Sequence, residues 1–296
     1  MNWDDLRVFL AVARGGSLSA AGQGLRIDPA TVGRRIARLE QSLGEALFLK
    51  SPQGYALTRA GEQLVARAEE AERALSGAED ALRGSADILD GTIRIGAPDG
   101  CANFLLPQVA AAIRAAHPKL EIQIIALPRV FNLSKREADL AIAVSPPDAA
   151  RLYGERVSDY RLHLAAAEVY LAGAEPLTRL ADLGTHTIVG YVPDMIFDRE
   201  LDYLSEAGGV TAELASNSVS VQGHLLRAGG GVGIVHDFML PFLPGVRRVL
   251  EGELSLKRTF WLVRHQNDRR RVGLARVAEL VVAGLRAEIA RLEAQA

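Results

Sequence analysis

Three arginines lie within five residues of one another in the first part of the chain, at Arg34, Arg35 and Arg38. A guanidinium group is planar and can donate two parallel hydrogen bonds to a guanine edge or to a phosphate. A helix that carries such side chains on one face therefore has the chemistry of DNA recognition. An isolated run of positive charge is more often a solvated helix face, so the neighbouring elements must decide between the two interpretations.

The residues around the arginines predict three short helices. A glycine pair at 15–16 ends the first apolar helical pattern, and Ser17 can cap the second helix. Asp28 and Pro29 supply an N-cap and a proline at the first helical position for the third, basic helix. The predicted helices cover residues 6–13, 18–25 and 29–43.

A β-hairpin is predicted after the third helix. Two short runs, at 46–50 and 55–58, flank the turn sequence Ser-Pro-Gln-Gly. Three small helices followed by a hairpin form a winged helix-turn-helix, whose third helix enters a major groove while the wing follows the DNA backbone. We therefore favour DNA binding over a solvated face. The side chains expected to face bases or phosphates are Thr31, Arg34, Arg35 and Arg38 on the helix, with Lys50 and Arg59 near phosphates.

The composition is that of a globular protein with local positive charge. Of the 296 residues, 49% are hydrophobic and 24% charged, which excludes disorder as the main state and predicts two or three domains. The net charge is −2, so the protein as a whole is not basic. Residues 1–60, however, hold eight Lys/Arg and five Asp/Glu, a net charge of +3. The positive charge is thus concentrated where DNA binding is predicted.

Cys101 is the single cysteine, which excludes a disulfide within the chain and a thiolate zinc site. The N-terminus, Met-Asn-Trp-Asp-Asp, lacks the basic lead and apolar core of a secretory signal. No apolar stretch reaches the ~18 residues that a membrane span needs. We therefore expect a cytoplasmic protein without a membrane partner.

A long helix is predicted from about residue 58 to about residue 87. Its apolar and small residues alternate spacings of four and three, which is a heptad seam. One interpretation is an amphipathic helix packed on its own domain. Thirty residues with charged outer faces and no partner segment favour a dimer helix. The seam residues are Leu64, Ala68, Ala71, Leu75, Ala78, Leu82, Ser85 and Leu89.

From Gly91 onward, apolar strands alternate with helices, which predicts α/β layers with mostly parallel strands. About 205 residues are generous for one sheet, so we expect two sheets with a cleft between them. The predicted strands are 92–97, 120–127, 139–144, 162–167, 187–192 and 231–235, and the predicted helices are 104–116, 219–228 and 272–292, with a helical turn at 134–138.

Enzyme signatures are missing from the sequence. The run Gly229–Gly233 does not fit G-x-G-x-x-G, because Ile234 stands where the last glycine should be, and it follows a helix instead of opening one. We interpret it as a tight helix-to-strand turn. The six histidines show no metal-ligand spacing, and no P-loop, G-x-S-x-G or H-E-x-x-H occurs. We predict no catalytic residues, metal or cofactor. Two alternatives are a solute-binding protein, disfavoured by residues 1–60, and a metabolic enzyme with a fused DNA-binding domain.

The first 65 residues resemble the LysR-type transcriptional regulators. The motifs are Leu6-x-x-Phe9-x-x-Val12-Ala13, Gly16-Ser17-Leu18-Ser19-Ala20-Ala21, Pro29-Ala30-x-Val32, Leu39-Glu40, Leu43-Gly44, Leu47-Phe48 and Leu57-Thr58-x-Ala60-Gly61. Two later motifs fit more loosely, at 137–142 and 228–234.

The resemblance implies an α+β multidomain protein. It would have a winged helix-turn-helix (1–60), a linker and dimerisation helix (61–90) and a two-lobed, periplasmic-binding-protein-like effector domain (91–296). Lobe I would be about 91–163 and 266–296, and lobe II about 164–265. The implied partners are a pseudo-palindromic operator in double-stranded DNA, a small-molecule effector and further copies of the chain as a dimer or tetramer. RNA polymerase is a further candidate partner.

Two positions depart from the family pattern in the DNA-binding domain. Gly33 replaces a serine that can reach phosphate, and glycine costs ~1 kcal/mol relative to alanine inside a helix. Lys50 replaces an arginine, which keeps the charge and loses the planar fork. The full set of predicted DNA contacts is Ser17, Pro29, Ala30, Thr31, Gly33, Arg34, Arg35, Arg38, Lys50 and Arg59.

The resemblance also implies an effector cleft near strand ends and helix N-termini. The family often has Ser or Thr after the first strand to bind a carboxylate, whereas this chain has Asp99 and Cys101. An acid there disfavours a carboxylate ligand unless Arg129 neutralises it, so an amine-bearing or neutral polar ligand is as plausible as an organic acid. Each position has a packing or capping alternative. The predicted contacts are Pro98, Asp99, Gly100, Cys101, Arg129, Ala143, Val144, Tyr191, Asn217, Ser218 and His236.

Together these features predict a DNA-binding transcriptional regulator whose DNA binding or activation is modulated by a small molecule in the cleft of its C-terminal domain.

Overall fold

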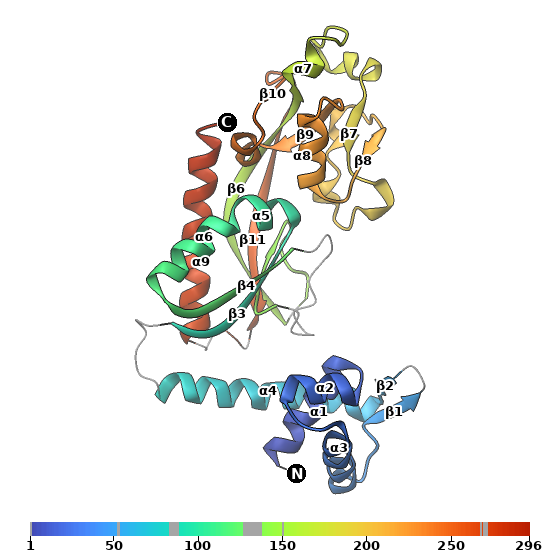
Figure 1. Cartoon of the computed structure of the whole chain (residues 1–296), viewed down its shortest axis with the longest axis vertical. Helices are drawn as coiled ribbons and strands as arrows, with labels where there is room; N and C mark the ends of the chain where they lie inside the picture. The colour runs from blue at the N-terminus through green and yellow to red at the C-terminus, as the bar shows by residue number, and fades with distance from the viewer. Residues whose placement is uncertain are drawn as a thin grey trace. The chain divides into compact units, whose positions relative to one another are not determined.

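The computed structural model describes residues 2–51, 54–82, 89–126, 138–149, 151–266, 268 and 272–296. The chain divides into two compact units (Figure 1). The first contains Met1–Gly84, and the second contains Ser85–Arg269 and Gly273–Ala296.

Three helices form the core of the first unit: α1 (Trp3–Gly15), α2 (Leu18–Leu25) and α3 (Pro29–Leu43). Gly16 adopts a left-handed conformation (φ 64°) that ends α1, and the Ser17 hydroxyl caps α2 by accepting a bond from the Ala20 N–H at 3.1 Å. Asp28 is the N-cap residue of α3 and Pro29 follows it, but the Asp28 side chain makes no capping hydrogen bond. The three predicted helices are confirmed, with boundaries that shift by a few residues.

The hairpin consists of β1 (Phe48–Ser51) and β2 (Gly54–Leu57), paired with Lys50 opposite Tyr55. Its base is tied to the helices on both sides. The Glu40 carboxylate accepts from the Leu47 N–H at 2.8 Å, and the Thr58 hydroxyl donates to the Ala46 carbonyl at 2.7 Å. These bonds fix where the wing leaves the helical core.

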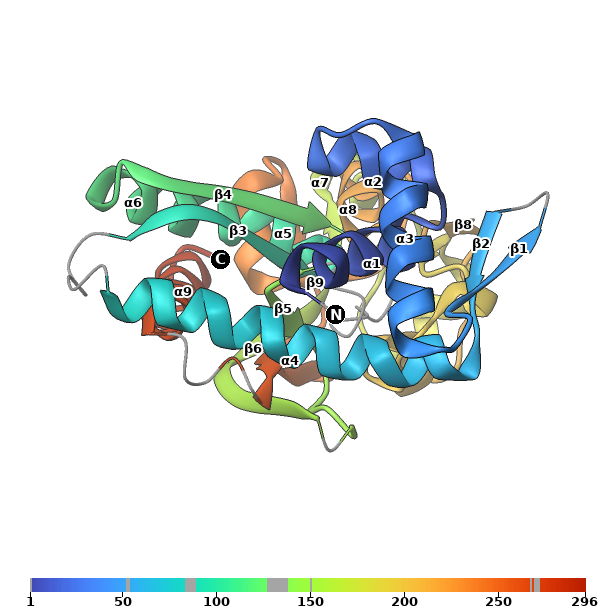
Figure 2. The same cartoon turned by 90° about the horizontal axis from the view of Figure 1, so that it is seen from below.

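The long helix is α4 (Arg59–Leu82), and α1, α2 and α3 gather at its hairpin end (Figure 2). Of the predicted seam, Ala68 is buried in the core of the first unit and Leu64 packs against it, while Leu75 is 45% exposed. Residues 83–88 lie outside the described part of the chain. Leu89 does not belong to the seam, because it is buried in the core of the second unit just before a strand begins at Asp90.

The second unit has two groups of parallel strands. We call the first group, with its helices, the first lobe: β3 (Asp90–Ala97), β4 (Lys119–Ala126) and β5 (Leu140–Ala143). The second lobe contains β7 (Ile188–Gly190), β8 (Leu214–Ala215) and β9 (Val232–His236).

Two long antiparallel strands run through both lobes, β6 (Leu152–Ala167) and β11 (Ser255–His265). β11 pairs with β5, and β6 pairs with β9 and with β10 (Val246–Arg248). The strand order is therefore β4-β3-β5-β11-β6-β9-β7-β8. The expectation of two separate sheets is corrected, since β6 and β11 join the two parallel groups into one hydrogen-bonded sheet.

The helices of the first lobe are α5 (Asp99–Phe104) and α6 (Leu106–Ala116), and α8 (Val219–Arg227) belongs to the second lobe. α9 (Val272–Glu293) ends the chain. The helix predicted from residue 104 in fact begins at Asp99 and is interrupted at Leu105. Shorter helical segments are α7 (Glu168–Leu171), η2 (Leu180–Thr185), η3 (Pro193–Met195), η4 (Arg199–Leu201), η5 (Leu204–Ala207) and η6 (Asp237–Phe242).

The glycine-rich run is the predicted tight turn between α8 and β9. Gly231 has a φ of 149°, and a Cβ there would lie 2.1 Å from the Thr187 carbonyl oxygen, so only glycine fits. The helical turn predicted at 134–138 lies largely outside the described residues. No helix in the described part of the chain is long and apolar enough to cross a membrane.

Candidate functional site

The solvent-facing side of α3 carries a pair of polar residues without an acidic partner in the described hydrogen bonds. Arg34 is exposed, and its Nη2 donates to the Thr31 hydroxyl at 2.8 Å. Pro29 and Ala30 are also exposed at the start of the helix. Because Thr31 is neutral, Arg34 keeps its full charge available to an approaching polyanion.

Arg38 has a different environment on the same helix. Its Nε donates to Asp5 Oδ2 at 2.9 Å and its Nη2 donates to the other carboxylate oxygen. The Asp5 side chain is only 4% exposed, so this pair ties α3 to α1, and it raises the pKa of Arg38. Arg35 is half-buried, with Nη1 3.8 Å from the exposed Asp4. The three arginines that spacing grouped together therefore differ in how freely they can contact DNA.

Ser17 and Gly33, two further residues of the predicted DNA-contact set, have structural roles inside the first unit. The Ser17 hydroxyl is engaged in capping α2. Gly33 faces α2, where a Cβ would lie 3.3 Å from Leu18 Cδ1. That separation is tight but involves the end of a flexible side chain. The glycine thus lets α2 and α3 approach closely.

The remaining predicted contacts lie outside α3. Lys50 is exposed on β1, with its Nζ 6.0 Å from the centre of the Tyr55 ring. Arg59 is exposed at the first position of α4. Both could add phosphate contacts beside a helix seated in a groove.

In the second unit, a small cavity lies where the two lobes meet. Eight of the predicted ligand contacts line it: Pro98, Asp99, Gly100, Cys101, Val144, Tyr191, Asn217 and His236. Its volume is about 20 Å³, which is room for about one water molecule. Sequence reasoning missed five further lining residues: Tyr160, Phe197, Leu201, Val219 and Phe260.

Two predicted contacts, Ser218 and Ala143, do not line the cavity. Ser218 is the N-cap of α8, where its hydroxyl accepts from the Val221 N–H at 3.3 Å. Ala143 packs in a small cluster with Trp261 and does not line the cavity. Arg129 lies outside the described residues.

Asp99 is the charged group of this cavity, and its carboxylate is bound to the second lobe. Oδ2 accepts from the hydroxyls of Ser218 (2.9 Å) and Ser220 (3.0 Å) and from the Ser220 N–H (2.9 Å). Oδ1 accepts from Asn103 Nδ2 at 3.0 Å. A residue of α5 thereby supplies the anion at the N-terminus of α8, and Figure 1 shows these two helices beside each other where the lobes meet.

The other titratable groups of the cavity are neutral. Burial lowers the pKa of His236 to about 3, and its Nε2 lies 3.3 Å from the Tyr203 hydroxyl. Burial also raises the pKa of the Cys101 thiol, which keeps it protonated and unreactive. The buried Tyr160 hydroxyl lies beside that of Tyr203.

Aromatic rings form the wall behind these groups. Tyr160 stacks on Phe260 with ring centres 4.1 Å apart, and Tyr191 meets Tyr203 edge-on at 5.9 Å. Most of this wall comes from β6, β11 and the segment after β7. Tyr191 was predicted, whereas Tyr160, Phe197 and Phe260 carried no sequence motif and were missed.

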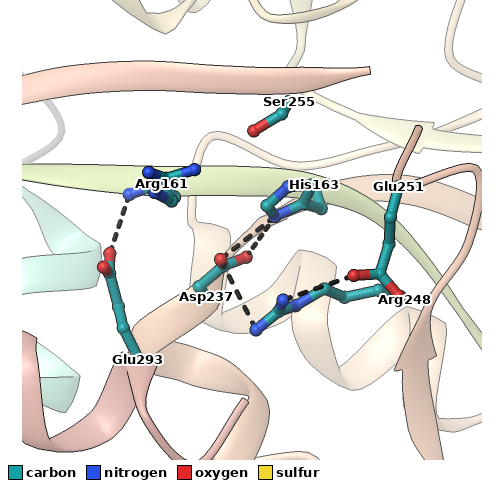
Figure 3. Close-up of a pocket in the computed structure, with 7 residues that line it drawn as sticks. All are labelled: Arg161, His163, Asp237, Arg248, Glu251, Ser255 and Glu293. Atoms are coloured by element: carbon teal, nitrogen blue, oxygen red, sulfur yellow. Dashed lines mark hydrogen bonds and ion pairs between the residues drawn. The ribbon is translucent and has the colours of Figure 1, made fainter. Parts of the chain in front are cut away.

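Two larger hollows lie in the same unit. One, of about 440 Å³, is lined by charged groups that already bond one another (Figure 3). His163 Nδ1 lies 2.8 Å from the buried Asp237, Arg248 lies 3.6 Å from the same carboxylate, and Glu293 accepts from the Arg161 N–H at 2.7 Å. We interpret it as a structural network of ion pairs and hydrogen bonds, in which Asp237 of η6 contacts β6 and Glu293 of α9 accepts from the main chain of β6.

The other hollow lies within the second lobe and measures about 250 Å³, with a mainly apolar lining. It shares Tyr191 and Leu201 with the cavity between the lobes. No group of three or more potential metal ligands occurs among the described residues.

Comparison with protein families gives two matches. Residues 3–62 match the bacterial regulatory helix-turn-helix proteins of the lysR family, and residues 86–286 match the LysR substrate binding domain. Together the two matches account for both compact units.

Similar individual proteins span nearly the whole chain. The HTH-type transcriptional regulator PtxR of Pseudomonas aeruginosa is 26% identical over 86% of this chain and 81% of its own length. The Mau operon transcriptional activator of Paracoccus denitrificans is 29% identical over 89% of both. The full-length structure of LysG from Corynebacterium glutamicum, with bound effector Arg, has a TM-score of 0.62 at 20% identity and covers 96% of this chain and 98% of its own.

Proposed function

The chain belongs to the LysR family of transcriptional regulators, and from that premise we propose that α3 is its DNA recognition helix and that an effector acts at the cavity between the lobes. It is a regulator and not an enzyme. The observation that supports α3 most is the exposed Arg34, whose guanidinium is bonded to the neutral hydroxyl of the half-buried Thr31.

On this proposal Arg34 and Thr31 contact base edges or phosphates in the major groove. Lys50 and Arg59 contact the backbone beside it. Arg38 acts through structure, because its guanidinium satisfies the buried carboxylate of Asp5. Arg35 is intermediate between the two roles.

Single substitutions of the arginines test this division. Arg34→Ala should weaken specific DNA binding by about 1–3 kcal/mol, measured by fluorescence anisotropy. Arg7→Ala, an exposed arginine on α1, is the matched control for charge and should change affinity much less. Arg38→Ala should lower the free energy of unfolding of the first unit, because it leaves the buried carboxylate of Asp5 without its partner. Arg34→Ala with unchanged affinity would overturn the recognition-helix assignment.

For the second unit, we propose that an effector shifts an equilibrium between arrangements of the two lobes. The small cavity, its position between the lobes and the charged residue Asp99 in its described lining support this location. The LysG structure, which holds Arg as its effector, is an example of a small molecule in a protein of this fold. The effector would act by binding the two arrangements with different affinities.

The same proposal extends to partners. A dimer would place two recognition helices in successive major grooves of a pseudo-palindromic operator. The exposed Leu75 on α4 supports this helix as the dimer contact. A tetramer and an encounter with RNA polymerase would follow from the family, and a DNA-binding regulator of this kind acts in the cytoplasm.

A further inference from the structure

Asp99 takes a position that is unusual for a charged side chain. It follows β3 at the start of α5 in the first lobe, yet its carboxylate bonds to residues 119 and 121 positions away in the second lobe. Three donors converge on one oxygen: two serine hydroxyls and the Ser220 N–H of the first turn of α8.

The Asp99 carboxylate thus occupies the place that a bound anion could take at the N-terminus of α8. The first turn of a helix has free N–H groups and a positive dipole end, and the two hydroxyls add further donors. Hydrogen bonds of this kind to a carboxylate are shorter and stronger than those between neutral groups. The N-terminus of α8 therefore already has its negative partner.

Among the described residues that line the cavity beside Asp99, none carries a positive charge that could balance a second anion. Among its described lining residues none is lysine or arginine, and burial keeps His236 neutral. A ligand carboxylate would thus lie in a buried space with Asp99 and without a counter-ion, which is costly.

The remaining wall suits a cation. Tyr160, Tyr191, Phe197 and Phe260 all line the cavity, and the faces of such rings attract ammonium groups. Oδ1 of Asp99 accepts a single described hydrogen bond, from Asn103, and retains capacity to accept more.

Resting on the proposed effector site, we propose that Asp99 is a latch between the lobes that also sets the ligand's charge: the cavity takes a protonated amine and excludes carboxylates. A ligand larger than water must separate the lobes, because the cavity measures about 20 Å³. Separation breaks the bonds from Ser218 and Ser220 to Asp99. The ammonium group then replaces those donors on the carboxylate.

The test compares butylamine with butyrate, which have similar size and opposite charge, as ligands of the purified full-length protein. Calorimetric titration of the wild type should give tighter binding of butylamine. Asp99→Asn keeps the size of the side chain and removes its charge. It should weaken butylamine binding by about 30-fold or more and improve butyrate binding.

Ser220→Ala is the matched control, because it removes one donor to the same carboxylate and leaves the charge in place. It should lower the melting temperature and keep the preference for butylamine. A purely structural Asp99 would instead give two destabilised variants with unchanged preference, which overturns the proposal. Butyrate binding to the wild type as well as butylamine, or no binding of either at millimolar concentration, would also overturn it.

The titration contains no DNA. It therefore reads the charge preference of the cavity independently of whether a ligand changes DNA binding. A failure of the latch leaves the recognition-helix test unaffected, and the reverse also holds.

Discussion

The two candidate sites handle charge in opposite ways. On α3, Arg34 is exposed and bonded only to a neutral hydroxyl among its described contacts, so its charge faces solvent. In the cavity between the lobes, Asp99 is surrounded by donors from its own chain, and the neighbouring histidine is neutral. The first site is ready for a large polyanion that approaches from outside, and the second must be opened before a ligand can enter.

Arg38 shows that whether a charge is free depends on its neighbours and not on the residue type. It lies on the same helix as Arg34, yet it pairs with the buried Asp5. Like Asp99, it joins two elements through a charge-assisted contact. A charged residue that is bonded to a second element of its own chain thus has a structural role first, whereas an exposed charge such as that of Arg34 is directly available for binding.

The largest expected effect comes from removing the aromatic wall of the cavity. Phe260 is 1% exposed and stacks on Tyr160. Phe260→Ala should cost about 3–5 kcal/mol of unfolding free energy, because it leaves a void in the core. Denaturant unfolding followed by circular dichroism measures this loss.

Phe104→Ala is the control for that variant, since Phe104 is only partly buried, packs against Phe242 and does not line the cavity. Its loss should be smaller, and DNA affinity should be retained by both folded variants. Equal losses of unfolding free energy in the two variants would mean that the aromatic residues of the cavity contribute no more to stability than a partly buried phenylalanine.

A smaller effect should appear as a pH dependence from His236. Its pKa in the folded protein is about 3, below the ordinary value of 6.5. The unfolded chain therefore binds a proton below pH 6.5 that the folded chain does not, and stability is lost as pH falls from 6.5 toward 3. Between pH 8 and pH 5 this residue should cost about 2 kcal/mol.

Other groups titrate in the same range, so the comparison must be with a variant. His236→Gln cannot take up the proton, and its unfolding free energy should fall less than that of the wild type between pH 8 and pH 5. Parallel pH profiles for the two proteins would mean that His236 is not held neutral by burial.

The smallest expected effect concerns Gly33. Gly33→Ser should gain about 0.5 kcal/mol in helix propensity, offset by the close approach to Leu18. A hydroxyl that reaches phosphate would add about 0.5–1.5 kcal/mol to DNA affinity. Anisotropy titration with Gly33→Ala as the control separates the hydroxyl from the helix effect. Equal affinity of the two variants would mean that this position does not reach the DNA.

The sequence predicted the first unit well because its signals are local. Ser17 and the glycine pair at 15–16 lie next to the helix ends that they define, and Pro29 begins α3. Most of the residues around the cavity were also predicted from strand ends and the family resemblance. The bond between Asp99 and Ser220 could not be predicted, because it joins residues 121 positions apart.

The long strands were the main omission. β11 and the first half of β6 were missed because charged residues interrupt their apolar pattern, as Lys257 and Arg258 do in β11. Without them the two parallel groups suggested two sheets. The same omission concealed Tyr160 and Phe260, which stand on these strands. The pairing of Arg38 with Asp5 could likewise not be predicted from spacing within one helix, because the two residues stand on different helices.

The most direct test of the account is an anisotropy titration of the full-length protein against DNA from upstream of its own gene. A scrambled duplex serves as the control, and both are measured at two salt concentrations. We expect tight binding that prefers the native sequence and weakens as salt rises, because basic side chains release counter-ions from the DNA. Equal binding to both duplexes, unchanged by Arg34→Ala, would contradict it.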